Sequence, residues 1–140
     1  MSQENLELHR RNVELWHARD FEAFIATCDP SIEFHTEFSA VGGGYHGHDG
    51  LRKFLRDFED AWGDEIRLEP EAYFDLGEHT LAFHVLHGRG SHSGAEVAMP
   101  VAHVFRWRDG LAIYFKAYYH REDALRDLGV SEDSLEPISP

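Results

Sequence analysis

The stretch from 101 to 123 constrains the fold more than any other part of the chain. It reads VAHVFRWRDGLAIYFKAYYHRED, and apolar and polar side chains alternate on both sides of the dipeptide Asp109-Gly110. Alternation with a period of two is typical of a strand that has one buried face. An Asp-Gly pair between two such runs is a strong signal for a tight turn. The stretch therefore predicts two long antiparallel strands that form a β-hairpin.

One position on the apolar face of this hairpin is polar. His103 has the same parity as Val101, Phe105 and Trp107, so its side chain points the same way. A buried polar group without a hydrogen-bond partner costs about 1–3 kcal/mol. We therefore expect His103 either to be held by a structural hydrogen bond, for instance with Asn12, or to face a cavity and contact a ligand. We expect burial to favour its neutral ring, which can donate or accept a hydrogen bond.

The rest of the chain shows helical periodicity first and strand alternation afterwards. Helices followed by a run of antiparallel strands indicate an α+β fold in which the helices cover one face of the sheet. A twisted sheet wrapped around helices leaves a concave pocket. We expect helices over 3–17, 21–28, 49–62 and 122–128, and strands over 32–38, 66–75, 79–90, 95–107 and 111–119.

Length and charge limit the classes of function that fit. A chain of 140 residues is the usual size of one domain, which we place at 1–130, with 131–140 as a flexible, solvated tail. The 26 acidic residues outnumber the 13 basic ones, for a formal net charge of −13, which argues against nucleic acid and anionic membranes as partners. We find no apolar run long enough to span a membrane and no secretory signal, so we expect a cytoplasmic protein.

The eleven histidines and the single cysteine do not indicate a metal site. His84 and His87, in the segment HVLH, point to opposite faces of a strand and cannot bind one ion together. Cys28 excludes an internal disulfide and is more typical of a small buried apolar side chain. We expect no metal and no cofactor.

Four segments, taken in their order and spacing, resemble a known family. They are ELWHARDFEAF at 14–24, SIEFH at 31–35, YHGHDGLRKF at 45–54 and HVFRWRDGLAIYFKAYYHREDAL at 103–125. Together they are similar to the SnoaL-like and ketosteroid isomerase-like group of the nuclear transport factor two-like superfamily. The resemblance implies a cone-shaped barrel, in which a curved antiparallel sheet wraps around the N-terminal helices and encloses a pocket. It does not imply one reaction, because this fold hosts many functions.

The resemblance also implies where catalytic groups would lie. In the related isomerases a carboxylate on the first strand moves a proton, while a tyrosine on the first helix and a protonated aspartate on a late strand hold the enolate oxygen. These positions fall on Phe34, Asn12 and His103. The SnoaL-like cyclases place a catalytic aspartate on the last strand, but 114–119 reads YFKAYY. If the protein is an enzyme, the resemblance implies an isomerase, dehydratase or cyclase type without the usual carboxylate, and His103 is the candidate catalytic residue.

Aromatic side chains are numerous enough to line a pocket as well as to fill a core. Aromatic walls suit flat apolar ligands. Our first hypothesis is a pocket that binds an apolar, partly oxygenated small molecule of polyketide-like or steroid-like character, with acid–base chemistry at His103 as an option. The alternative is a non-catalytic domain that binds a ligand or serves dimerisation. The candidate ligand-binding residues are Asn12, Trp16, Phe34, Tyr45, Phe58, Trp62, Phe83, Phe105, Phe115 and Tyr119.

The other face of the sheet leads us to expect a homodimer. Ala102, Val104 and Tyr118 alternate with the pocket-facing positions and are too apolar for open water. We therefore expect a second subunit to cover this convex face.

Overall fold

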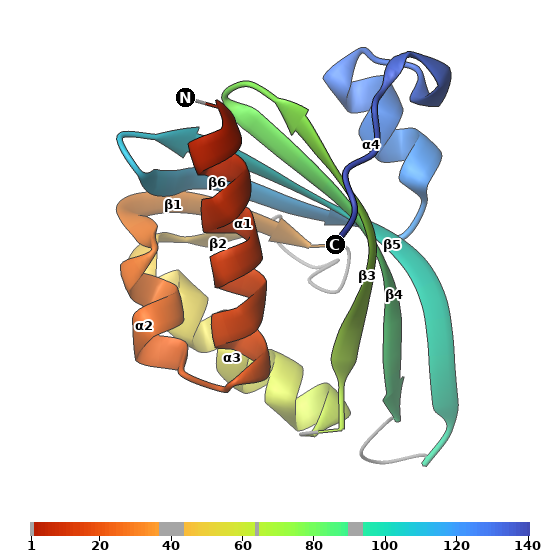
Figure 1. Cartoon of the computed structure of the whole chain (residues 1–140). Helices are drawn as coiled ribbons and strands as arrows, with labels where there is room; N and C mark the ends of the chain where they lie inside the picture. The colour runs from red at the N-terminus through yellow and green to blue at the C-terminus, as the bar shows by residue number, and fades with distance from the viewer. Residues whose placement is uncertain (1, 37–43, 64, 90–93) are drawn as a thin grey trace.

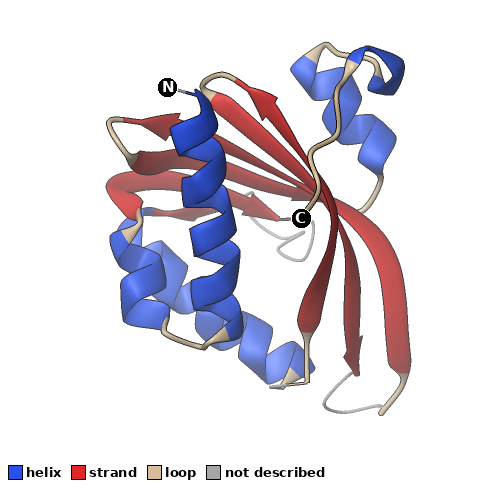
Figure 2. Cartoon of the chain, in the orientation of Figure 1, coloured by secondary structure: helices blue, strands red, loops and turns tan. Residues whose placement is uncertain are grey.

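Apart from one additional short strand at Tyr45–His46, helices and strands follow one another in the order that the sequence predicts (Figures 1 and 2). The structure, a computed structural model, describes residues 2–36, 44–63, 65–89 and 94–140. Within these residues the helices are α1 (Ser2–His17), α2 (Phe21–Ala26), α3 (Gly47–Trp62) and α4 (Arg121–Leu128), followed by a 3-10 turn at Glu132–Ser134. The strands are β1 (Cys28–Thr36), β2 (Tyr45–His46), β3 (Arg67–Leu76), β4 (His79–Arg89), β5 (Glu96–Arg108) and β6 (Leu111–Tyr118). The end of the first predicted strand, at 37–38, lies outside the described residues.

The strands form one sheet in the order β2-β1-β6-β5-β4-β3. Strands β3 to β6 are the predicted antiparallel meander, and the turn between β5 and β6 has positive φ at both Asp109 (52°) and Gly110 (80°), as a tight hairpin turn requires. One pairing differs from the all-antiparallel sheet that we expected, because β1 runs parallel to β6. No tight turn joins these two strands, and the long connection through α3 and four other strands permits the parallel direction.

The sheet curves strongly and stays open, and α1 lies across its concave face (Figure 1). Helix α1 contacts β3 and β4, while α3 packs against β1 and β2 at the other end of the sheet. The largest cluster of buried side chains lies between these layers and includes Leu15, Ile32, Leu51 and Phe105. In α3 the buried Leu51, Phe54 and Leu55 stand at the predicted helical spacing. The α+β fold is therefore the one that the residue pattern predicts.

Helix α4 and the C-terminal segment cover the part of the convex face that carries Ala102, Val104 and Tyr118. Ala102, Val104 and Tyr118 are buried, and they form one cluster with Ala124 of α4. Leu125 and the neighbouring apolar residues of α4 and the C-terminal segment pack against this cluster. The apolar character of these positions is thus explained within one chain, and it gives no reason to expect a second subunit on this face.

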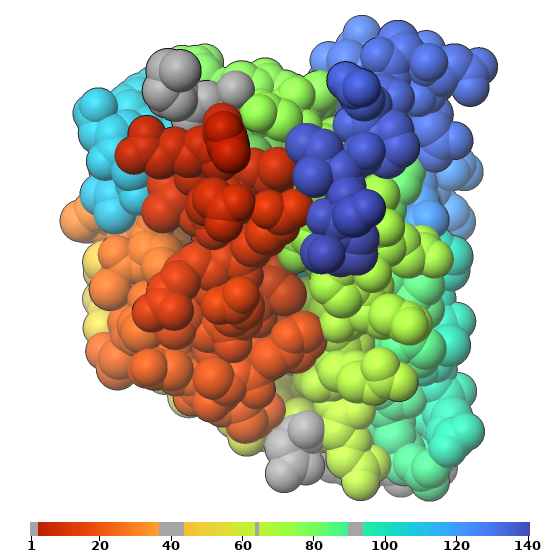
Figure 3. Space-filling view, in the orientation of Figure 1, coloured from red at the N-terminus to blue at the C-terminus, as the bar shows by residue number. Residues whose placement is uncertain are grey.

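The C-terminal residues 131–140 contact the sheet, whereas we expected them to be a solvated tail. Ile138 and Tyr73 exchange two backbone hydrogen bonds, of 2.8 and 2.9 Å. The guanidinium of Arg10 on α1 donates to the carbonyl oxygen of Ser139 at 2.8 Å. Figure 3 shows the segment lying along the junction of α1 and the sheet. Its two backbone bonds extend the edge strand β3, which would otherwise present unpaired groups.

Three histidines lie inside the concave side of the sheet. His9 and His84 are completely buried, and His103 is half-buried where it borders a cavity. Burial is the main cause that lowers the pKa of each ring: the pKa of His84 falls to about 4, and the pKa values of His9 and His103 fall well below the usual 6.5. Arg10 near His9 and Arg121 near His84 add to this effect, and all three rings are neutral at pH 7.

We predict that these rings make the fold sensitive to acid. Their pKa values are lower in the folded chain than in the unfolded one, so below pH 6.5 the unfolded state binds more protons and stability falls. His84, whose folded-state pKa is about 4, should by itself remove roughly 2 kcal/mol of unfolding free energy between pH 7 and pH 5, and His9 and His103 act in the same direction. Urea unfolding across this range measures the loss. The variant His84→Phe should lose less stability than the wild type, whereas His120→Gln, at an exposed position, should behave as the wild type does.

We also predict that the C-terminal segment stabilises the fold. Leu135 and Ile138 are partly buried against the sheet, so replacing both by alanine should lower the unfolding free energy by roughly 2–4 kcal/mol. The exposed neighbour Glu136, changed to alanine, serves as the control. Urea unfolding at pH 7 compares the two variants. An unchanged midpoint for the double variant would mean that the segment is solvated after all.

Candidate functional site

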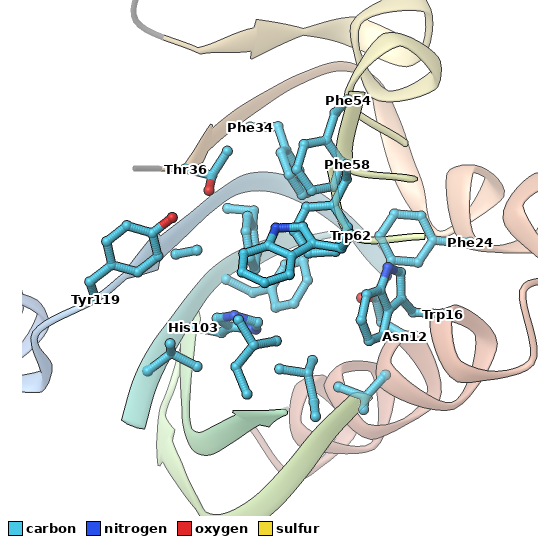
Figure 4. Close-up of a pocket in the computed structure, with 17 residues that line it drawn as sticks. Asn12, Trp16, Phe24, Phe34, Thr36, Phe54, Phe58, Trp62, His103 and Tyr119 are labelled. Carbon is cyan, nitrogen blue, oxygen red and sulfur yellow. The ribbon is translucent and has the colours of Figure 1, made fainter. Parts of the chain in front are cut away.

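A cavity of about 80 Å³ lies between α1, α3 and the concave face of β1, β5 and β6 (Figure 4). Most of its lining is aromatic or aliphatic, and none of the described lining residues is an acid, a lysine or an arginine. The polar groups that reach it come from side chains such as Thr36, His103 and Tyr119. The predicted site residues that line it are Asn12, Trp16, Phe34, Phe58, Trp62, His103, Phe105, Phe115 and Tyr119.

Two predicted ligand-binding residues do not line this cavity. Tyr45 packs on Phe54 from the outside, and its hydroxyl donates to Asp57 Oδ2 at 3.0 Å. Phe83 lies on the convex face of β4, against Phe74 and below the guanidinium of Arg121. Only their aromatic character suggests a place at the cavity. For Phe83, the period of two in β4 predicts the convex face instead, because its neighbours on either side face the concave surface.

Several lining residues were missed by the sequence analysis. Phe54 and Val101 border the cavity, and so do Leu68 and Leu86. A signal for two of them was present in the sequence: Phe54 belongs to the same helical stripe as Phe58, and Val101 has the same parity as His103. The other two come from β3 and β4, whose distance from the first helix is set by the curvature of the sheet.

His103 lies in β5 between two small residues. Its pairing partners are Ala82 on β4 and Ala117 on β6, which leave room for the ring on both sides. No hydrogen bond joins this ring to another described residue, and its ring contacts are with His84 and Phe115, each at 5.1 Å between centroids. Burial, followed by the nearby His84 and His9, lowers the pKa of His103. The cavity therefore borders a neutral imidazole whose nitrogen atoms are open to a ligand.

The contact between Asn12 and His103 that we considered is not formed. The Asn12 side-chain amide donates to Thr27 Oγ1 at 2.9 Å, and that hydroxyl donates to the carbonyl oxygen of Phe24 at 2.6 Å. Figure 4 shows Asn12 and His103 on different sides of the cavity. Thr27 follows α2, which packs beside α1, and so it reaches Asn12 before any strand residue does. Asn12 therefore ties two helices together as well as lining the cavity.

Phe34 forms an apolar wall where the related isomerases would carry a carboxylate. Its ring is stacked on Phe115, with 4.3 Å between centroids and 19° between the planes, and it contacts Phe54 at 4.6 Å. The side chain is buried. No proton acceptor stands at this position, in agreement with the sequence.

Other reactive groups lie apart from the cavity. His84 faces the concave side, whereas His87 contacts Glu69 Oε1 at 2.9 Å on the opposite side of the strand, as predicted. Burial raises the pKa of the Cys28 thiol to about 11, so the thiolate is absent at neutral pH. The described residues contain no group of three histidine, cysteine or acidic side chains placed to hold a metal ion. Across that same part of the chain, no helix is both long and apolar enough to cross a membrane.

Solved structures share this fold over nearly the whole chain. An NTF2-like protein of unknown function from Burkholderia pseudomallei K96243 is 25% identical, with a TM-score of 0.77 over 90% of this chain and 97% of that one. TerC, co-crystallised with polyporic acid, is 22% identical, with a TM-score of 0.74 over 89% of this chain and 97% of that one. A protein with a ketosteroid isomerase-like fold from Catenulispora acidiphila DSM 44928, in complex with trimethylamine, is 16% identical, with a TM-score of 0.71 over 91% and 95%.

Sequence comparison gives the family directly. No curated protein matches the chain. Residues 9–115, which span α1 from its middle through most of β6, match the family model of the SnoaL-like domain. The match contains the helices and strands that surround the cavity, and the resemblance seen in the sequence is confirmed: the chain belongs to the SnoaL-like domain family.

Proposed function

We propose that the protein binds a flat, largely apolar small molecule that carries at least one oxygen atom, and that His103 makes the polar contact. The observation that carries this proposal is the single unbonded imidazole at the wall of an otherwise apolar cavity. Because no described lining residue is charged, a ligand with several charges would lose its hydration without compensation.

The walls of the cavity support a ring-shaped ligand. Phe34 and Phe115 present stacked rings, and Trp16, Phe58 and Trp62 form a second group of aromatic rings in contact. Flat ligands gain dispersion contacts between such surfaces. The cavity of about 80 Å³ is smaller than the engineered cavity of roughly 150 Å³ that holds benzene. A ring therefore needs the partly exposed Trp62 or Tyr119 to move aside.

The comparison with TerC supports an oxygenated aromatic ligand, because that protein was co-crystallised with polyporic acid. We extend this ligand class to the present chain on the strength of the shared fold and the aromatic cavity. Polyketide-like and steroid-like molecules have the required combination of flat apolar rings and sparse oxygen atoms.

A second candidate function is proton transfer at His103, of the isomerase, dehydratase or cyclase type. The neutral ring, with no hydrogen bond to a described residue, can accept a proton from a bound molecule. Such reactions usually need a second group, and no carboxylate is present among the described lining residues. Binding is for this reason the function that the geometry supports best.

We predict that His103→Phe weakens binding of an oxygenated ring while leaving the fold intact. The probes are 1-indanone, which carries one carbonyl oxygen, and indane, which has the same rings without it. Loss of the hydrogen bond should lower the affinity for 1-indanone about tenfold and change the affinity for indane little. Titration followed by tryptophan fluorescence reports binding, because Trp16 and Trp62 line the cavity.

Thermal unfolding of the same variant distinguishes the two roles of His103. If the role of His103 is only structural, the His103→Phe variant should unfold at a lower temperature and keep the wild-type preference between the two probes. His87→Phe, on the outside of β4, is the matched control and should bind both probes as the wild type does. If neither probe binds to the wild type, the proposed function is wrong for this ligand class.

A further inference from the structure

Three histidines from separate elements lie close together on the concave side of the sheet. His9 belongs to α1. His84 lies two residues after Ala82 on β4, and His103 on β5 pairs with Ala82. Ala82 is fully buried. The ring centroids of His9 and His84 are 6.5 Å apart, and those of His84 and His103 are 5.1 Å apart. The three rings therefore form a continuous row from the back of α1 to the cavity.

The far end of this row is anchored by the Thr80 hydroxyl. Thr80 Oγ1 lies 2.7 Å from His9 Nδ1 and 2.9 Å from Trp107 Nε1. An indole N–H can only donate, so the Thr80 oxygen accepts from Trp107. No other described group lies within hydrogen-bond distance of this hydroxyl, so its hydrogen points to His9 Nδ1. The geometry thereby assigns the proton of neutral His9 to Nε2.

Beyond the contact with Thr80, the ring nitrogens of His9 and His84 have no hydrogen-bond partner among the described residues. These atoms are His9 Nε2 and both ring nitrogens of His84, and both side chains are completely buried. Such groups are rare in folded proteins and point to a role. Arg10 beside His9 and Arg121 near His84 add positive charge, which disfavours a protonated ring. Each ring is neutral and carries one N–H and one lone pair.

We propose that His9 and His84 are positioning residues that direct an N–H of His103 into the cavity, so that the cavity takes a carbonyl, quinone or enolate oxygen rather than a hydroxyl hydrogen. The N–H of His9 is favoured facing the lone pair of His84, and the N–H of His84 is favoured facing the lone pair of His103, because aligned dipoles stabilise one another in a medium of low dielectric constant. His103 is then left with its N–H toward the ligand. This inference rests on the proposed function and specifies its ligand class.

Long-range proton–nitrogen NMR of the histidine rings tests the row without a ligand. At pH 7 the free protein should show His9 protonated at Nε2 only. In Thr80→Val, which lacks the hydroxyl, the His9 tautomers should become mixed or reversed. Protonation of His9 at Nδ1 in the wild type would overturn the proposal, whatever the protein binds.

Binding of the two indane probes tests the consequence for the ligand. The wild type should prefer 1-indanone to indane roughly five- to tenfold, and the carbonyl stretching band of bound 1-indanone should shift to lower frequency. In His84→Phe the preference should fall toward one and the band should move back, although residue 84 does not line the cavity. His84→Gln, which can both accept and donate, should restore part of the preference. A purely structural His84 would leave the preference and the band unchanged.

These outcomes separate the two proposals. If His103→Phe removes the preference and His84→Phe does not, the proposed function stands and the positioning role is wrong. If 1-indanone fails to bind to the wild type, the ligand class is wrong, and the NMR measurement still decides whether the row is polarised. Should His84→Phe fail to fold, Thr80→Val acts on the same row from its other end and takes its place in the binding test.

Discussion

The packing of α1 across the concave face of the sheet is the contact on which the rest of the structure depends. One face of this helix supplies Asn12 and Trp16 to the cavity and places His9 beside His84 and Phe105. The sheet can bend around α1 because β4 and β5 are long and strongly twisted. Without the helix, the apolar concave face would be open to water. The cavity is therefore a gap left between two surfaces that must pack for hydrophobic reasons.

The interior contrasts with the surface in its electrostatics. The chain carries a formal net charge of −13, yet no described residue that lines the cavity is charged. The histidines that reach the interior are neutral because burial lowers their pKa values. A ligand bound in this cavity, as we propose, would be recognised by its shape and by one or two hydrogen bonds. It also lacks the carboxylate that the isomerases of this fold use, because Phe34 occupies that position and stacks on Phe115.

Periodicity predicted the elements well, and contacts between distant elements poorly. The stripe of α3 and the alternation of β5 placed Phe58 and His103 on the correct faces, because side-chain direction within one element depends only on backbone geometry. The aromatic character of Phe83 suggests the cavity, but its parity along β4 predicts the convex face, where it packs against Phe74. The parallel direction of β1, and the cover that α4 provides for Val104, depend on long connections whose path no local pattern specifies.

The sequence by itself determined the fold class, the family and the position of His103 on the inner face, since each follows from local spacing or from motifs in order. Only the tertiary structure decided the partners of the polar side chains. Asn12 bonds to Thr27, and His9 to Thr80, across separations of 15 and 71 residues. His9 could be recognised as an inward-facing residue from its spacing, but its neighbours could not. The physical reason is that a hydrogen bond requires atoms within about 3 Å, and only the packed arrangement of helix and sheet fixes distances between segments so far apart in the chain.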